Sequence, residues 1–74
     1  MGFRDEPARR AIAYMEEALA FEEAAVKRYS EHIASIGHPD INAFLEGVLR
    51  TEQGHVAELR ARIDALKAML KEEG

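Results

Sequence analysis

Three side chains that can bind a metal ion interrupt two otherwise apolar patterns in this chain. Glu22 lies between Leu19 and Val26, in a segment where every third or fourth residue is apolar. Glu52 and His55 interrupt a second such segment, and their spacing of three residues puts both on one face of a helix, one turn apart. A carboxylate in an apolar stripe costs free energy unless it is paired, protonated or bound to a metal. We therefore interpret these three residues as ligands of one metal site.

The ligand types narrow the choice of metal. Carboxylate oxygens with an imidazole nitrogen suit iron or manganese, and zinc can enter such a site. Cysteine is absent, so thiolate ligands and disulfides are excluded. A Glu-x-x-His pair alone is a weak signal in a Glu-rich helix, but its place on the apolar stripe and the presence of Glu22 strengthen it. One alternative stays open: Glu52 and His55 only hydrogen-bond to each other in a polar layer of the core.

Four further residues near this pattern are weaker candidates for a role in the site. Tyr29 follows Glu22 by two helical turns, so it is either a phenol that hydrogen-bonds a ligand carboxylate or an interface tyrosine that fills the core. Gly54, between the ligands, either permits the close approach of another helix or is neutral. We expect His32 and His38 to be surface or capping residues.

Two long helices joined by a tight turn are the elements that must position these side chains. Pro7 follows two acidic residues, which predicts a helix start. Gly37 suits the left-handed position that ends a helix, and Pro39 suits the first turn of the next. We predict helices over about residues 7–36 and about 39–72.

Each predicted helix has one apolar stripe, interrupted only by the candidate ligands. The stripes comprise Ile12, Met15, Leu19, Glu22, Val26, Tyr29 and Ile33, and Ile41, Leu45, Val48, Glu52, His55, Leu59, Ile63, Leu66 and Leu70. An antiparallel turn near residue 38 puts Glu22 and Glu52 at a similar level. One hairpin leaves too much apolar surface exposed, and a second hairpin remedies this. The prediction is an all-α chain, one domain over 1–74, forming an antiparallel two-helix hairpin that dimerises into a four-helix bundle.

Length and charge exclude several classes of protein. A chain of 74 residues allows one small domain, which is often marginally stable alone. The net charge of −4 disfavours nucleic acid as a partner and is compatible with attraction of cations. No apolar run approaches the roughly 20 residues of a membrane span, and the N-terminal residues lack the apolar core of a secretory signal. We therefore expect a cytoplasmic protein without nucleic-acid or membrane partners.

The order Glu22-x6-Tyr29 followed by Glu52-x-x-His55 resembles the half-motif of rubrerythrins and other ferritin-like proteins. In those proteins each half of a four-helix chain carries the pattern once. Here it occurs once in the whole chain, which is most similar to the encapsulated ferritins, two-helix halves of a ferritin. The likeness also covers the turn at residues 37–40. It implies a ferritin-like four-helix bundle in which two copies supply four carboxylates and two imidazoles, the ligand set of ferritin-like di-iron proteins.

The resemblance also implies a function. It predicts a ferroxidase, oxidising Fe²⁺ to Fe³⁺ at a di-iron site for iron storage or detoxification, with Glu22, Glu52 and His55 as ligands and Tyr29 nearby. It further implies a homodimer, a ring of such dimers, and residence inside an encapsulin shell. Two rival interpretations stay open. One is a rubrerythrin-like peroxide scavenger with the same ligands, and the other is a helical dimer without ferroxidase activity whose polar layer sets register.

Two segments depart from the encapsulated-ferritin pattern. Residues 71–74 do not resemble the segment that docks those proteins to their shell, so a free-standing assembly also stays open. Phe21 and Ala24 lie beside Glu22 without matching the acidic residues that line the metal entry route in that family. Ring assembly and shell association are therefore expectations from the resemblance alone.

Overall fold

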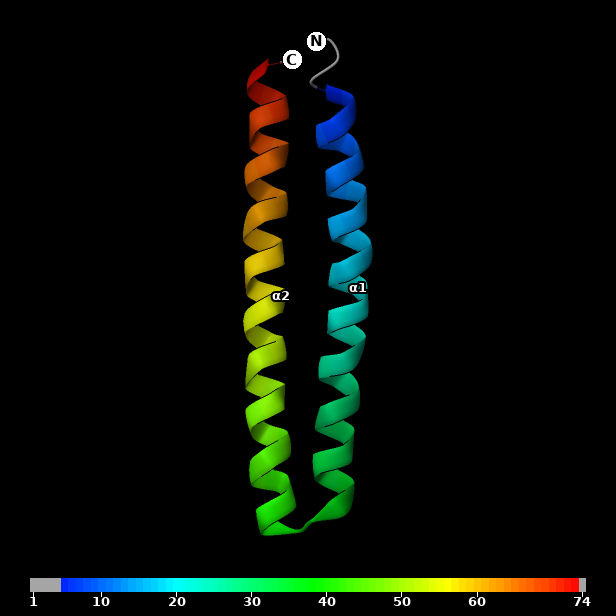
Figure 1. The fold of residues 1–74 in the computed structure, drawn as a ribbon, viewed down its shortest axis with the longest axis vertical. Helices are drawn as coiled ribbons and strands as arrows, with labels where there is room; N and C mark the ends of the chain where they lie inside the picture. The colour runs from blue at the N-terminus through cyan, green and yellow to red at the C-terminus, as the bar shows by residue number, and fades with distance from the viewer. Residues whose placement is uncertain (1–4, 74) are drawn as a thin grey trace.

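Two helices of nearly equal length make up the computed structural model, which describes residues 5–73. Helix α1 spans Asp5–Ile36 and α2 spans Pro39–Glu73, and no strand occurs between these limits. The helices run antiparallel and side by side along their whole length (Figure 1). The predicted all-helical hairpin is therefore confirmed. The predicted domain 1–74 also includes residues 1–4 and 74, which lie outside the described residues.

Two of the four helix ends, at residues 36 and 39, match their predicted positions, and the other two differ by one or two residues, a usual difference. Helix α1 begins at Asp5 because Pro7 fits within its first turn, where an N–H group has no partner inside the helix. Helix α2 begins at Pro39, as predicted, and ends one residue later than predicted, at Glu73.

A two-residue turn reverses the chain. Gly37 has a φ angle of 65°, the left-handed conformation predicted for it, which is accessible to glycine without steric cost. His38 then caps α2: its Nδ1 accepts a hydrogen bond from the Ile41 amide at 3.4 Å, and its carbonyl accepts one from the Asn42 amide at 2.8 Å. The turn thus satisfies first-turn donors of α2 that lack an intrahelical partner.

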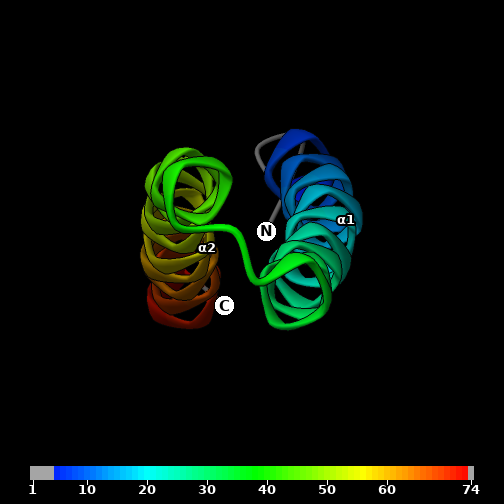
Figure 2. The same ribbon diagram turned by 90° about the horizontal axis from the view of Figure 1, so that it is seen from below.

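The contact between the helices forms only a thin core. Among the residues described, only Ile12 and Ile63 are buried, with 8% and 4% of their surface exposed. The remaining stripe residues are mostly half-buried, because each helix has a single neighbour (Figure 2). Over residues 5–73, neither helix carries an apolar stretch of the length that a membrane crossing requires.

The molecule is a rod with more surface than a compact chain of its size. It measures 55 × 14 × 12 Å, and its radius of gyration is 16.7 Å, against about 11 Å for a compact domain of this length. Its accessible surface is 5622 Å², against about 4,600 Å² for a compact monomer of the same mass. The hairpin therefore exposes about 1,000 Å² that a globular packing would bury.

Two ion pairs join the helices along one side of the hairpin. Lys67 Nζ lies 3.1 Å from Glu16 Oε2, and Arg60 Nη2 contacts Glu23 Oε2. The two pairs are seven residues apart on each helix, so they lie on one side, two turns apart. We call this side, defined by these four residues, the ion-paired face.

Large apolar side chains collect on the opposite side. Tyr14 and Phe21 each precede an ion-paired glutamate by two residues, which turns them about 200° around α1. Met69 follows the ion-paired lysine by two residues, and Phe44 lies at nearly the same angle about seven turns earlier. These four side chains are 66%, 77%, 55% and 72% exposed, in that order. We call this side the apolar face.

Candidate metal centre

The structure brings the three predicted ligands together near the middle of the hairpin. Glu22 extends from α1, and Glu52 and His55 extend from α2, where they are one turn apart. One ligand atom from each residue lies within 4.8 Å of the others. Because a metal–ligand bond is about 2.0–2.2 Å long, a shift of less than an ångström would let one ion contact all three.

His55 lies between the two carboxylates. Its Nδ1 is 3.0 Å from Glu52 Oε1, a hydrogen-bonding distance, and 3.6 Å from Glu22 Oε1, which is too long for a hydrogen bond. In the tautomer that donates from Nδ1 to Glu52, Nε2 keeps a free lone pair. The carboxylate therefore orients the imidazole. Nε2 can serve as a ligand in this tautomer, and Nδ1 can do so after a change of tautomer.

Two shielded side-chain oxygens have no hydrogen-bond partner among the described residues, Asn42 Oδ1 and Glu22 Oε1, and only the second belongs to the cluster. Leaving such an acceptor unsatisfied costs about 1–3 kcal/mol. The neighbouring side chains of Glu52 and His55 offer another carboxylate and an imidazole, so a divalent cation is the natural partner for this oxygen. The residues present therefore fit iron or manganese.

The centre is open towards the apolar face. The side chains of Glu22 and Glu52 are only 25% and 21% exposed, but that of His55 is 54% exposed. Glu22 also lines a groove together with Tyr14 and Phe21. Iron and manganese commonly take six ligands, and one chain provides three residues. The remaining positions are thus accessible from the apolar face.

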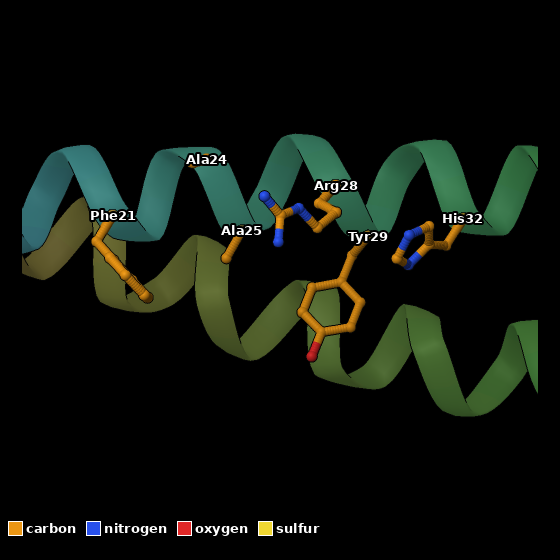
Figure 3. A pocket seen from close by; sticks show the side chains of 6 residues that line it. All are labelled: Phe21, Ala24, Ala25, Arg28, Tyr29 and His32. Atoms are coloured by element: carbon orange, nitrogen blue, oxygen red, sulfur yellow. The ribbon is translucent and has the colours of Figure 1, made fainter.

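The structure does not join Tyr29 to the centre. Its ring lies edge-on to His32, with centroids 6.4 Å apart and planes at 82°, on the side of α1 shown in Figure 3. No hydrogen bond connects Tyr29 to the cluster among the residues described, and its predicted role stays a prediction. His32 is exposed, as expected. A Cβ at Gly54 would meet nothing within 4 Å, so α1 does not require this glycine.

Sequence reasoning missed the ion-paired face. Glu16, Glu23, Arg60 and Lys67 all lie outside the two apolar stripes from which the fold and the candidate ligands were predicted. The signal that could have found them is the repeat of acidic residues seven apart in α1 and basic residues seven apart in α2. These pairs fix the level of α1 against α2, and Glu23 does so directly beside the ligand Glu22.

Comparison of the chain with protein-family models, curated proteins and solved structures finds no match. The likeness to ferritin-like proteins therefore stays a prediction, and it rests on the types and spacing of Glu22, Tyr29, Glu52 and His55. What the described residues provide is the antiparallel hairpin that such a protein needs, with three potential ligands at one level.

Proposed function

We propose that this chain is a ferroxidase that oxidises Fe²⁺ to Fe³⁺ at a di-iron carboxylate site formed between two copies. The observation that carries the proposal is the shielded, unpartnered Oε1 of Glu22 next to Glu52 and His55. A cation supplies the missing partner for this oxygen, and the two other residues supply the donors that ferrous iron accepts.

A second copy would complete the ligand set and cover surface at the same time. Two copies of Glu22, Glu52 and His55 make four carboxylates and two imidazoles, as in ferritin-like four-helix bundles. The hairpin exposes about 1,000 Å² more surface than a compact monomer. This area is similar to the roughly 800 Å² that each partner buries in a standard interface. One partner of the same chain would thus meet both needs.

The two kinds of ligand have distinct roles in the proposal. Glu22 and Glu52 of each copy would hold the two Fe²⁺ ions through anionic carboxylate oxygens, and His55 would add a neutral imidazole nitrogen. Each Fe²⁺ substrate gives up one electron, so two ions reduce dioxygen to hydrogen peroxide with the uptake of two protons. The carboxylates would accommodate the higher charge of Fe³⁺ because each is anionic.

Iron must be attracted to the site and then passed on. The net charge of −4 favours the approach of cations. A dimer of thin hairpins encloses no storage space, so oxidised iron leaves for a mineral outside the dimer. A ring of dimers and an encapsulin shell would provide that space, and this part of the proposal rests on the resemblance alone.

Stopped-flow measurement of Fe²⁺ oxidation tests the proposal. Loss of a residue that only supports a metal ligand typically lowers activity by about 10–100-fold. We expect Glu52→Ala and His55→Ala, which remove candidate ligands themselves, each to lower the oxidation rate by more than that. Gln53→Ala, at an exposed residue next to Glu52 whose side chain lines a groove with Glu23 and Arg60, is the matched control and should leave the rate unchanged. Unchanged oxidation in both ligand variants would refute the ferroxidase.

The hydrogen bond between His55 and Glu52 favours a second candidate, a structural helical dimer without metal. In that protein the two side chains would satisfy each other in a polar layer. Native mass spectrometry with and without Fe²⁺ separates the candidates, since only the ferroxidase gains metal, and bound metal also raises the melting temperature. Competition between dioxygen and peroxide in the oxidation assay identifies a rubrerythrin-like peroxide scavenger.

A further inference from the structure

Two hollows flank Phe21 on the same side of α1. One is lined by Tyr14, Glu17 and Ala18, and the other by Ala24, Ala25 and Arg28, with Tyr29 and His32 at its far end. Figure 3 shows the short alanines leaving a gap between Phe21 and the longer Arg28 and Tyr29. This second hollow has a volume of about 290 Å³. A cavity of about 150 Å³ admits benzene, so the hollow has room for a phenyl ring.

We infer that a second copy docks along α1 in the antiparallel direction, with Phe21 of each copy in the hollow beside the partner's Ala25, and Glu17 of each copy next to the partner's Arg28. The identity of the occupant as a second copy rests on the proposed function. The orientation and register of docking rest on the pattern of large, small and charged side chains along α1.

The register follows from a two-fold axis that crosses α1 near residue 23. Such an axis pairs each residue with one about equally far on the other side. Phe21 and Ala25 are each two residues from this centre, so a large side chain meets a small one. Tyr14 and His32 are each nine residues away and also pair. The axis passes at the level of Glu22, so the two copies of the metal centre meet there.

Charge complementarity selects the antiparallel direction. Glu17 and Arg28 have no ion-pair partner among the described residues. They lie six residues before and five residues after the centre, so antiparallel docking forms two intermolecular ion pairs. If the two α1 helices instead faced each other in parallel, each Glu17 would face its own copy, and so would each Arg28. Like charges in that arrangement would oppose association.

The chain contains no cysteine, so single cysteines report the register directly. We expect Glu17→Cys chains mixed with Arg28→Cys chains to form a disulfide-linked pair in EDTA with oxidised glutathione, which is reduced to the thiol as the disulfide forms. Each variant alone should cross-link weakly, because identical positions lie more than about 15 Å apart along the bundle. Self-linking of either variant, or no cross-link in the mixture, would overturn the inference.

Charge reversal tests the same contact without oxidation. Glu17→Arg and Arg28→Glu should each raise the dimer dissociation constant about tenfold, because each turns two attractive pairs into repulsive ones. The double variant should restore it. Lys27→Glu, exposed beside the ion-paired face, is the control and should change little. Additive weakening in the double variant would contradict the antiparallel register.

These measurements are separate from the test of the proposed function because they use metal-free protein. A dimer that shows the predicted cross-link but does not oxidise Fe²⁺ supports the docking geometry and contradicts the ferroxidase. A chain that oxidises Fe²⁺ but does not give the cross-link between positions 17 and 28 overturns the docking geometry alone. Circular dichroism confirms that each variant keeps its helices, since both substituted positions are exposed.

Discussion

The two long faces of the hairpin differ in whether their side chains contact the other helix. On the ion-paired face, charged side chains of one helix reach those of the other, as in the contact between Lys67 and Glu16. On the apolar face, large side chains such as Phe21 and Phe44 are more than 70% exposed and contribute little to the contact between the helices. The charged side chains of the ion-paired face find partners within one chain, whereas the large apolar side chains of the apolar face stay exposed to solvent.

The cluster of Glu22, Glu52 and His55 lies towards the apolar face. Glu22 lines a groove with Tyr14 and Phe21, and His55 is half exposed. The next residue along α1, Glu23, is instead ion-paired with Arg60. Two adjacent glutamates thus have opposite circumstances, one with a partner from its own chain and one with an unpartnered oxygen. The ion-paired face therefore contributes contacts between the two helices, and the apolar face is the one on which we propose that a second copy binds.

The largest expected effect comes from a charge on the apolar face. Phe21→Asp should raise the dimer dissociation constant more than 100-fold, since each of two symmetric phenylalanines contributes about 1.5–3 kcal/mol when buried. The stability of the single hairpin should change by no more than about 0.5 kcal/mol, because the residue is exposed there. Sedimentation equilibrium of this variant and of Lys27→Asp as a control measures the difference. Equal weakening in both would remove the distinction between the faces.

The adjacent glutamates provide the second comparison. Glu22→Leu should raise the metal-free free energy of unfolding by about 1–3 kcal/mol, because it removes an unsatisfied shielded acceptor. The same change should abolish any rise in melting temperature with Fe²⁺. Glu23→Leu should keep that rise, because its side chain contacts Arg60 and not the cluster. Thermal melts with and without metal decide this, and a metal response that survives Glu22→Leu would contradict the assignment.

The smallest effect is expected on the ion-paired face. Lys67→Ala should lower the free energy of unfolding by about 0.5–1 kcal/mol, as for an exposed ion pair. Dimer affinity should stay the same, since this face is remote from the proposed interface. A double-mutant cycle with Glu16→Ala isolates the pair, and about 1 M salt should remove most of the coupling. A change in dimer affinity as large as that of Phe21→Asp would reverse the roles of the two faces.

The hairpin and the meeting of the ligands could be predicted because both follow from local rules. Gly37 and Pro39 mark the turn, and the apolar period fixes which side of each helix faces the other. Once the turn is placed, Glu22 must lie near Glu52 and His55. The helix ends were less certain, because Pro7 is compatible with a start at or slightly before it.

The contacts made by side chains on the faces beside the apolar stripes could not be predicted from the sequence as easily. Whether Glu23 and Arg60 touch depends on the lateral tilt and axial offset of two helices, which the apolar period does not determine. The same holds for Tyr29: its spacing from Glu22 fits a contact, but in the hairpin its ring lies beside that of His32 and its hydroxyl points towards α2 (Figure 3). Residues whose partners lie on another chain add a further unknown, because one sequence contains only half of such a contact.

The turn at Gly37 and His38 also has a consequence for how the hairpin forms and opens. Contacts next to the turn close very short loops and cost little chain entropy. Pairing of the helices can therefore begin at the turn and extend residue by residue towards the chain ends. The three candidate ligands lie about halfway along the hairpin, so we expect them to come together only after the half nearer the turn has paired. Opening from the far end, near Asp5 and Glu73, would separate about half of each helix before it reached them. Amide exchange should therefore be fastest at that end and slower at the level of the ligands.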